Sequence, residues 1–565
     1  MSRNVKDLYN EWLEKATDSA IAEELKNIAN NEEAINDAFY RDLAFGTGGL
    51  RGVIGAGTNR MNIYTVAKAT QGFSNYINAT STKDVKSVAI GYDSRINSDI
   101  FSRTAAAVFA ANGIKVYIYP ELMPTPAVSF AIRTLDCDAG VMITASHNPA
   151  KYNGYKAYGA DGCQVKTQVA SDISDAFNAL DIFADIKEHD FESSLEAGQI
   201  EYISEEIYTQ YIEAVKSLSL LDENTEINKD VKIIYSPING TGLKPVLRIL
   251  NELGYTNVSV VKEQEEPDGR FPTTPRPNPE FPETMELGIQ YAKCENADMV
   301  MATDPDADRL GIAIKNPDGE FELVSGNLVG VLFLEYIIER RKAMNKLPEN
   351  AVLVKTIVTT SLADRIAKEN GIKVENVLTG FKYIGDKIGQ LEAEGRVDDY
   401  ILGFEESYGY LSSSHVRDKD AVNAAFLAAE MFSYYMTKGV NLFDKLEQIY
   451  EKYGFTYDKM QSYKFEGETG FKKMNSIMEA IRKPVTELAG FELSKVLDYN
   501  KGVGDLPLSD VMQFFLGDKG SVVVRPSGTE PLIKVYVSVK VEREMAEEIT
   551  AKIFEAIEDF AGIND

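Results

Sequence analysis

Three aspartates alternate directly after an apolar run in the segment ADMVMATDPDADRL. The carboxylates of Asp304, Asp306 and Asp308 fall within five residues, and they would repel one another unless a cation gathers them. An EF-hand loop is excluded, because Arg309 occupies its glycine position and Lys315 the position of its bidentate glutamate. Hard oxygen ligands with an incomplete shell favour Mg²⁺ that also holds a phosphate oxygen. The alternative is a solvated acidic turn.

The segment GVMITASHNPAKYNGYK places a second polar turn at the end of a strand-type run. It contains Ser146 and His147, and Lys156 follows ten residues after the serine. We expect a helix to start just after the serine, so that backbone N–H groups and the helix dipole favour an anion at its hydroxyl. A serine that only caps a helix is the alternative. A hydrolase nucleophile is disfavoured, because the segment has no G-x-S-x-G elbow.

The segment RPSGTEP combines Arg525 with Ser527, Gly528 and Thr529 in a tight turn. Arginine binds phosphate through two parallel hydrogen bonds, and glycine lets backbone amides approach an oxyanion. We therefore expect an anion-binding turn, and a plain hairpin turn is the alternative.

Three other motifs carry weaker signals. The segment GFEESYGY presents Glu405 and Ser407 beside aromatic residues, a composition suited to sugar hydroxyls. The segment TGFKYIGDK has Asp386 where a Walker loop needs lysine, so nucleotide binding is excluded there. In FGTGGLRG, Arg51 fills the place of the third Rossmann glycine and no strand precedes it, so we expect a glycine-rich turn that presents Arg51.

The elements that must position these residues alternate between strand-type runs and amphipathic segments. Such alternation predicts α/β layers with mostly parallel strands, whose chemistry lies just past the strand C-termini. We expect three α/β domains with mixed, largely parallel sheets around a central cleft, followed by a smaller α+β C-terminal domain. The boundaries expected are 1–45 for an N-terminal helical extension of domain 1, then 46–205, 206–325, 326–450 and 451–565 for domains 1 to 4.

Composition narrows the class of protein. A net charge of -28 over 565 residues argues against binding nucleic acid or an anionic membrane, because both require a positive field. Three scattered cysteines fit neither a disulfide framework nor a zinc site. No uninterrupted apolar run reaches membrane-spanning length, so a cytoplasmic protein is expected.

The motifs TASHNP, DPDADR, GFEES and RPSGTEP, in that order, resemble the α-D-phosphohexomutase superfamily of phosphoglucomutases and phosphomannomutases. The resemblance runs from about Gly46 to Val537. The helical N-terminal segment, FGTGGLRG and GFEESYGY resemble the branch of long bacterial phosphoglucomutases and phosphopentomutases.

The resemblance implies that Ser146 is the phosphorylated serine of domain 1 and that the three aspartates of domain 2 hold Mg²⁺ against its phosphate. It implies that Lys156 is the general acid/base, with His147 and Arg51 beside the phosphoserine. Domain 3 then binds the sugar, and domain 4 is a phosphate-binding lid. The substrate-binding residues implied are Arg309, Thr379, Gly380, Lys382, Glu405, Ser407, Lys419, Arg525, Ser527, Gly528 and Thr529.

The expected activity is the interconversion of α-D-glucose 1-phosphate and glucose 6-phosphate, with glucose 1,6-bisphosphate as intermediate and activator. Alternatives are a phosphopentomutase, a phosphomannomutase, a bisphosphate synthase, or a catalytically silent regulatory or binding homologue. We expect a monomer or homodimer with a small phosphosugar as substrate. Because the chain is acidic, a local group of basic residues must reverse the field inside the cleft.

Overall fold

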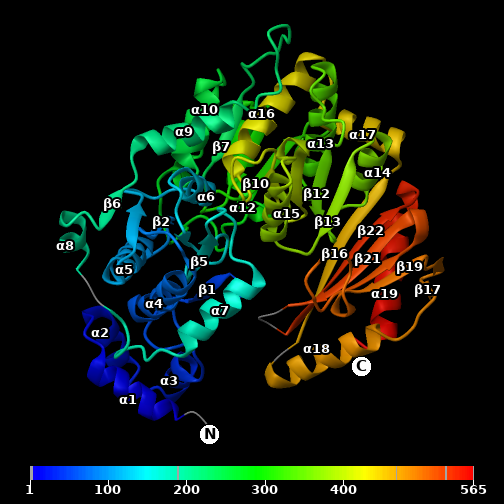
Figure 1. The fold of residues 1–565 in the computed structure, drawn as a ribbon. Coiled ribbons are helices and arrows are strands. Elements are labelled where there is room, and N and C mark those ends of the chain that lie inside the picture. The colour runs from blue at the N-terminus through cyan, green and yellow to red at the C-terminus, as the bar shows by residue number, and fades with distance from the viewer. Residues whose placement is uncertain (1–3, 47, 188–189, 466, 528–530, 564–565) are drawn as a thin grey trace.

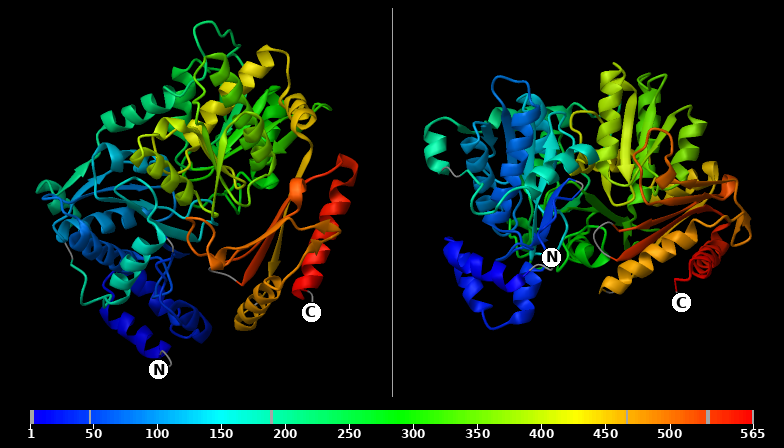
Figure 2. Two further views of the ribbon diagram at one scale, coloured as in Figure 1. Left: turned by 45° about the vertical axis from the view of Figure 1, so that its right-hand side comes forward. Right: turned by 60° about the horizontal axis from the view of Figure 1, so that its bottom comes forward.

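The computed structural model describes residues 4–46, 48–187, 190–465, 467–527 and 531–563. Four layered units follow one another along the chain, and Figure 1 shows them as an arc that runs from blue to red. In two further views the orange and red C-terminal unit stays opposite the blue and cyan N-terminal unit (Figure 2).

Three short helices form the N-terminal extension. Each begins at a residue whose side chain accepts a backbone N–H of the first turn: Asn4, Asp18 and Asn31. Trp12 packs edge-on against Phe39 and holds the helices together. They are α1 (Val5–Lys15), α2 (Ser19–Asn27) and α3 (Glu32–Phe39).

The first unit is a six-stranded sheet in the order β1-β5-β4-β2-β3-β6, in which β4, β2, β3 and β6 are mutually parallel and β5 runs antiparallel to both of its neighbours, β4 and β1. Buried apolar strands and helices on both faces give this layer its core. The strands are β1 (Gly49–Val53), β2 (Ser87–Tyr92), β3 (Lys115–Ile118), β4 (Ala139–Ile143), β5 (Tyr152–Gly159) and β6 (Ile200–Tyr202). The helices are α4 (Ile63–Thr80), α5 (Ser98–Ala111), α6 (Thr125–Thr134), α7 (Thr167–Asn178) and α8 (Phe191–Glu196).

The second unit is a five-stranded sheet in the order β11-β10-β9-β7-β8, again parallel on one side and antiparallel on the other. The strands are β7 (Ile233–Ser236), β8 (Val258–Val260), β9 (Met299–Thr303), β10 (Leu310–Lys315) and β11 (Phe321–Val324). The helices are α9 (Glu205–Lys216), α10 (Leu243–Glu252), α11 (Lys262–Glu265) and α12 (Pro282–Glu295).

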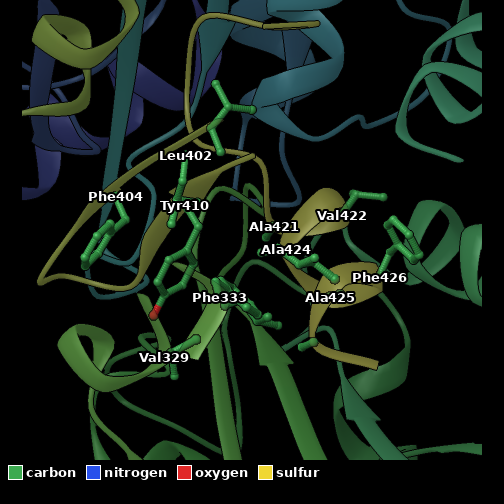
Figure 3. Packing of buried hydrophobic residues seen from close by; sticks show 14 of the residues in the cluster. Val329, Phe333, Leu402, Phe404, Tyr410, Ala421, Val422, Ala424, Ala425 and Phe426 are labelled. Atoms are coloured by element: carbon green, nitrogen blue, oxygen red, sulfur yellow. The ribbon is translucent and has the colours of Figure 1, made fainter. Parts of the chain in front are cut away.

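The third unit has a four-stranded sheet in the order β13-β12-β14-β15. The strands are β12 (Val352–Thr356), β13 (Lys373–Val377), β14 (Tyr400–Glu405) and β15 (Gly409–Leu411). The helices are α13 (Gly326–Ala343), α14 (Leu362–Glu369), α15 (Phe381–Ala393), α16 (Ala421–Thr437) and α17 (Leu442–Tyr453). Phe333 of α13 packs edge-on against Tyr410 of β15, with ring centroids 5.2 Å apart (Figure 3).

The fourth unit is an antiparallel five-stranded sheet in the order β16-β22-β21-β20-β19, covered by two helices, with a separate β17–β18 pair. The strands are β16 (Thr456–Lys464), β17 (Glu487–Leu488), β18 (Phe491–Glu492), β19 (Lys495–Asp498), β20 (Met512–Phe515), β21 (Gly520–Pro526) and β22 (Leu532–Lys540). The helices are α18 (Gly467–Ile481) and α19 (Ala546–Ala561). The predicted fold class, α/β units followed by an α+β unit, is confirmed.

The hydrophobic cores divide the molecule unequally. One continuous cluster includes Met142 of the first unit, Met301 of the second and Phe404 of the third. The fourth unit has its own core, and a small cluster around Tyr499 and Val358 joins it to the third.

Candidate active site

Ser146 lies in the turn between β4 and β5, not in front of a helix. The chain runs from β4 through this turn directly into antiparallel β5, so the expected helix dipole at the hydroxyl is absent from this part of the structure. Ser146 adopts a left-handed backbone conformation with φ of 50°, which bends the chain back and is uncommon for a residue other than glycine. Its N–H donates to Thr144 Oγ1 at 2.7 Å.

Arg95 stabilises this turn through hydrogen bonds to its backbone. The Arg95 guanidinium donates hydrogen bonds to four backbone carbonyls of the turn and its exit, those of Ser146, Asn148, Pro149 and Tyr152. Asp93 Oδ2 forms an ion pair with the buried Arg95, whose Nε lies 3.4 Å away. The same oxygen accepts a hydrogen bond from Thr144 Oγ1 at 2.6 Å. The strained turn is thus fixed by a buried ion pair that follows β2.

The three aspartates lie in the turn between β9 and β10, and this turn faces Ser146. The Ser146 hydroxyl donates to Asp304 Oδ2 at 2.8 Å, and one carboxylate oxygen of each aspartate lies within 4.8 Å of the others. All three side chains are buried. Burial, followed by the charges of Asp308 and Asp306, raises the pKa of Asp304 well above its usual value.

The donor set fits a divalent cation. Asp306 Oδ1 and Asp308 Oδ1 are buried, and neither accepts a hydrogen bond from any described residue. Such oxygens are costly to bury without a partner. A hard cation bound by carboxylate oxygens would satisfy them and relieve the repulsion among the three aspartates. Thr125, at the start of α6, fixes Asp306 by donating to its Oδ2 and to its carbonyl, each at 2.9 Å.

Two lysines contact the same carboxylates. Lys156 Nζ, on β5, lies 2.8 Å from Asp306 Oδ2 and 3.1 Å from Asp308 Oδ2, and Lys419 Nζ lies 2.8 Å from Asp308 Oδ2. Burial lowers the pKa of Lys156, but the charges of Asp306 and Asp308 outweigh it, so the net pKa is raised. The rise has a direct cause, because two carboxylates contact the ammonium.

Arg51 lies on a strand and not in a glycine-rich turn, which corrects the expectation. It belongs to β1, opposite Gly154 of β5, and its Nη1 donates to Asn148 Oδ1 at 3.2 Å. His147 Nδ1 lies 3.2 Å from Ser146 Oγ. Burial, with the charges of Arg309 and Arg51, lowers the pKa of His147 well below its usual value, so the ring is neutral near pH 7.

A cavity of about 360 Å³ opens beside His147 and contains several of the expected substrate residues. Its polar lining is mixed in charge, and we call it the inner cavity. The charged and hydroxyl side chains that line it include Glu280, Arg309, Thr379, Glu406, Ser407, Asp458, Lys459, Arg525 and Lys534.

The other expected substrate residues are placed as follows. Glu405 is buried next to the inner cavity and accepts from Ser407 Oγ at 3.1 Å. Gly380 precedes α15 with φ of 119°. Lys382 lies in the first turn of α15, and its ammonium lies over the Tyr383 ring. It is absent from the described lining of the inner cavity and from that of a second, larger cavity described below. Gly528 and Thr529 lie outside the described residues.

A second cavity of about 730 Å³ adjoins the inner one, and we call it the outer cavity. It lies between the turn of Arg525 and Ser527 on one side and the N-terminal extension with β1 on the other. Asp37 is the one acidic residue of its described lining, whereas the basic ones are Arg41, Arg51, Arg60, Lys151, Arg525 and Lys534. The lining agrees with the expected positive field in an acidic protein.

Sequence reasoning did not single out Asp93, Arg95, Thr125 or Lys534. Asp93 and Arg95 had a usable signal, because they directly follow the strand-type run SVAIGY and so share a sheet edge with the turn of Ser146. Lys534 directly opposes Arg525 in the β21–β22 hairpin, which a register count could have found. Thr125 had no signal beyond its place before a helix.

The fold and site define a family of phosphosugar enzymes. Models of the phosphoglucomutase/phosphomannomutase family match the whole succession of units: α/β/α domain I at residues 42–182, domain II at 209–319, domain III at 325–453 and the C-terminal domain at 481–556. The chain belongs to this family, which confirms the predicted superfamily.

Individual relatives are similar along almost the whole chain. A phosphoglucomutase of Staphylococcus saprophyticus is 38% identical over 560 residues, covering 96% of this chain and 98% of that protein. A phosphoglucomutase of Staphylococcus aureus strain USA300 is 34% identical over 558 residues, covering 96% and 98%.

Solved structures share the fold. The phosphoprotein parafusin of Paramecium, a phosphoglucomutase in an open form, superposes with a TM-score of 0.69 at 20% identity, covering 93% of this chain and 95% of that one. A phosphoglucomutase/phosphomannomutase family protein of Burkholderia thailandensis gives 0.67 at 18%, covering 92% and 97%. Across the described ranges, no helix is long and apolar enough to cross a bilayer.

Proposed function

We propose that the protein interconverts α-D-glucose 1-phosphate and glucose 6-phosphate through a phosphorylated Ser146. The observation that carries the proposal is the Ser146 hydroxyl placed 2.8 Å from Asp304, in a buried aspartate trio with two oxygens that accept no hydrogen bond from a described residue. Full-length similarity to phosphoglucomutases supports glucose as the sugar. The three free cysteines are consistent with a reducing compartment such as the cytoplasm.

In this mechanism Asp304, Asp306 and Asp308 would hold Mg²⁺ together with a phosphate oxygen on Ser146. The ion would withdraw charge from the transferring group. Lys156 is the group that exchanges a proton with the sugar hydroxyl, since its ammonium already lies at the aspartates. Neutral His147 and the Arg51 guanidinium adjoin the serine and bind the phosphoryl oxygens.

The transfer has two halves. A sugar hydroxyl attacks the phosphorus while the bond to Ser146 Oγ breaks. Lys156 gives a proton to the departing Ser146 Oγ and takes up the proton of the attacking hydroxyl, which leaves a free serine, the lysine ammonium and glucose 1,6-bisphosphate. The bisphosphate turns over, and its other phosphoryl group returns to Ser146 by the reverse step. Throughout, Arg525 and Ser527 bind the phosphate that does not react, while Glu405 and Ser407 bind sugar hydroxyls.

Intact-mass measurement tests the phosphoserine. The wild-type protein incubated with glucose 1,6-bisphosphate should gain one phosphoryl group and lose it when excess glucose 1-phosphate is added. Ser146→Ala should neither gain the group nor turn over substrate. Ser476→Ala, at an exposed position of α18, is the matched control and should behave as wild type. Mutase activity in Ser146→Ala would exclude the proposal.

The sugar is tested in parallel. Assays on glucose 1-phosphate, mannose 1-phosphate and ribose 1-phosphate, each with its bisphosphate, should give the highest kcat/KM for glucose. A clear preference for another sugar would keep the phosphoserine chemistry and replace the substrate. Absence of turnover on all three, with no phosphoryl group on Ser146, would indicate a silent regulatory homologue.

A further inference from the structure

The outer cavity contains basic residues that the proposed reaction leaves without a role. Arg41 and Lys151 line it on the side of the N-terminal extension and the serine turn, and Lys534 lines it on the side of the fourth unit. Arg41 and Lys151 do not line the inner cavity in the part of the chain that the structure describes.

None of these three cations forms a close ion pair with a described residue. Among the described residues, Arg41, Lys151 and Lys534 have no carboxylate within ion-pairing distance, whereas neighbouring Arg60 pairs with Asp37 at 2.5 Å. The chain as a whole is acidic, with 87 acidic and 59 basic residues. Unpaired cations that face one hollow provide a site for an anion.

Arg41 is held in position for such a role. Its Nε donates to Asn59 Oδ1 at 3.0 Å, and its carbonyl accepts from Thr58 Oγ1 at 2.8 Å. The two Nη groups donate no hydrogen bond to any described residue. They are available to a phosphate, which arginine binds through paired N–H donors.

On the opposite wall of the outer cavity, two cations lie side by side and repel each other. Arg525 and Lys534 are direct partners in the antiparallel β21–β22 ladder, and like charges placed opposite one another destabilise a hairpin. Both line the inner and the outer cavity, as does His147. A phosphate could therefore pass from one cavity to the other and remain in contact with the same cations.

The two cavities differ in what they can bind. The inner cavity has acidic Glu280, Glu406 and Asp458 in its lining and suits hydroxyl groups as well as one phosphate. The outer cavity, with a single paired acid, suits a dianion.

We propose that Arg41 and Lys151, together with Lys534, form a second phosphate subsite in the outer cavity, which retains the sugar bisphosphate while its two ends exchange. The inference rests on the proposed function, because it assigns the place where the intermediate of that reaction is kept. It also gives the N-terminal extension a role, since Arg41 directly follows α3.

A partition experiment tests the subsite. Enzyme with a labelled phosphoryl group on Ser146 is mixed with glucose 1-phosphate and a large excess of unlabelled glucose 1,6-bisphosphate. Label retained through the turnover emerges as glucose 6-phosphate, and label that escapes emerges as free bisphosphate. In Arg41→Gln combined with Lys151→Gln, the escaped fraction should rise about tenfold or more, because loss of even one charge-assisted hydrogen bond has about that effect.

Two further variants make the test specific. Arg41→Lys combined with native Lys151 keeps the charge and should restore most of the retention. Arg103→Gln removes one charge from exposed α5, where the residue pairs with Glu192, and it should partition as wild type. Because Arg41 and Lys151 are exposed, their variants should fold, which unfolding curves would verify.

The outcomes separate the two proposals. An escaped fraction equal to that of wild type in the double variant would overturn the second subsite, even if turnover were slower. An equal rise in Arg103→Gln would overturn it too, because the effect would then be general electrostatics. Failure of the wild-type protein to transfer any label to glucose 1-phosphate would instead contradict the phosphoserine mechanism.

Discussion

Two regions of the cleft differ in how the units that carry them are packed. One contains the turns of Ser146 and of the three aspartates, and the other contains the turn of Arg525. Ser146 and the aspartates are carried by units that share one continuous hydrophobic core with the third unit. Arg525 is carried by a unit with its own core and a small contact to the third unit. The distances between serine and aspartates are thereby fixed, whereas the unit that carries Arg525 shares only a small apolar cluster with the third unit among the described residues.

The two regions also differ in how their charged side chains are paired. At the serine, the ammonium groups of Lys156 and Lys419 are paired with aspartates. At the outer cavity, Arg525 and Lys534 face each other with no described carboxylate partner. In the proposed mechanism, a cation would complete the charge balance of the aspartates at Ser146, and the phosphate of the substrate would balance the cations at Arg525. Variants in the two regions should therefore fail in different ways.

The largest loss is expected from Asp308→Asn. The change removes one ligand of the proposed ion and one partner of both lysines, so kcat/KM should fall by about a thousandfold or more. Steady-state kinetics with a Mg²⁺ titration measure it. Asp318→Asn, in an exposed turn of the same unit, is the control. Activity within tenfold of wild type, with unchanged Mg²⁺ dependence, would remove the aspartates from the transfer centre.

A smaller and different loss is expected from Arg525→Ala. Removing the guanidinium should raise KM and lower kcat/KM by about a hundredfold, because a bidentate phosphate contact is lost. The rate at which glucose 1,6-bisphosphate phosphorylates Ser146 should fall, but its final extent should remain one group by mass. Lys495→Ala, on β19 of the same unit, should leave both unchanged. Wild-type kinetics in Arg525→Ala would contradict the clamp.

Arg95→Lys tests whether the hydrogen bonds of the Arg95 guanidinium keep the serine turn rigid. Lysine keeps the charge beside Asp93 but cannot span four carbonyls. We expect kcat to fall about ten- to a hundredfold, as for other residues that orient a reacting group, with KM within about twofold. A rise in KM with unchanged kcat would show that Arg95 serves substrate binding instead.

The sequence was informative wherever a polar turn follows an apolar strand. In all four units the chemistry-bearing turn joins two consecutive antiparallel strands: β4–β5, β9–β10, β14–β15 and β21–β22. Those turns are local, and their residue types can be read directly. The ligand trio and the serine were found in this way.

Features that depend on distant contacts could not be read. The left-handed backbone of Ser146 depends on Arg95, about fifty residues earlier, and no local propensity calls for it. The pKa of Lys156 depends on aspartates 150 and 152 residues away. The helix expected after Ser146 was wrong for the same reason, because pairing of β5 with β4 and β1 overrides the local signal.

The smallest effect is expected in stability and not in catalysis, at the wall of the inner cavity. Burial, followed by the charge of Glu405, raises the pKa of Glu406 from 4.5 to about 7. Between these values the folded protein holds a proton that the unfolded chain has released, so the free energy of unfolding falls as pH rises through this window. The penalty is absent below the lower value and complete above the higher one.

Glu406→Gln should therefore stabilise the protein near pH 8 and change little near pH 5. The shift sets an upper limit of about 3 kcal/mol, and partial exposure of the side chain reduces it. Urea unfolding at both pH values measures the difference, and Glu349→Gln, at an exposed position, is the control. If Glu406→Gln raised the free energy of unfolding equally at both pH values, the Glu406 carboxyl would not be the titrating group. Its pKa in the folded protein would then not be raised.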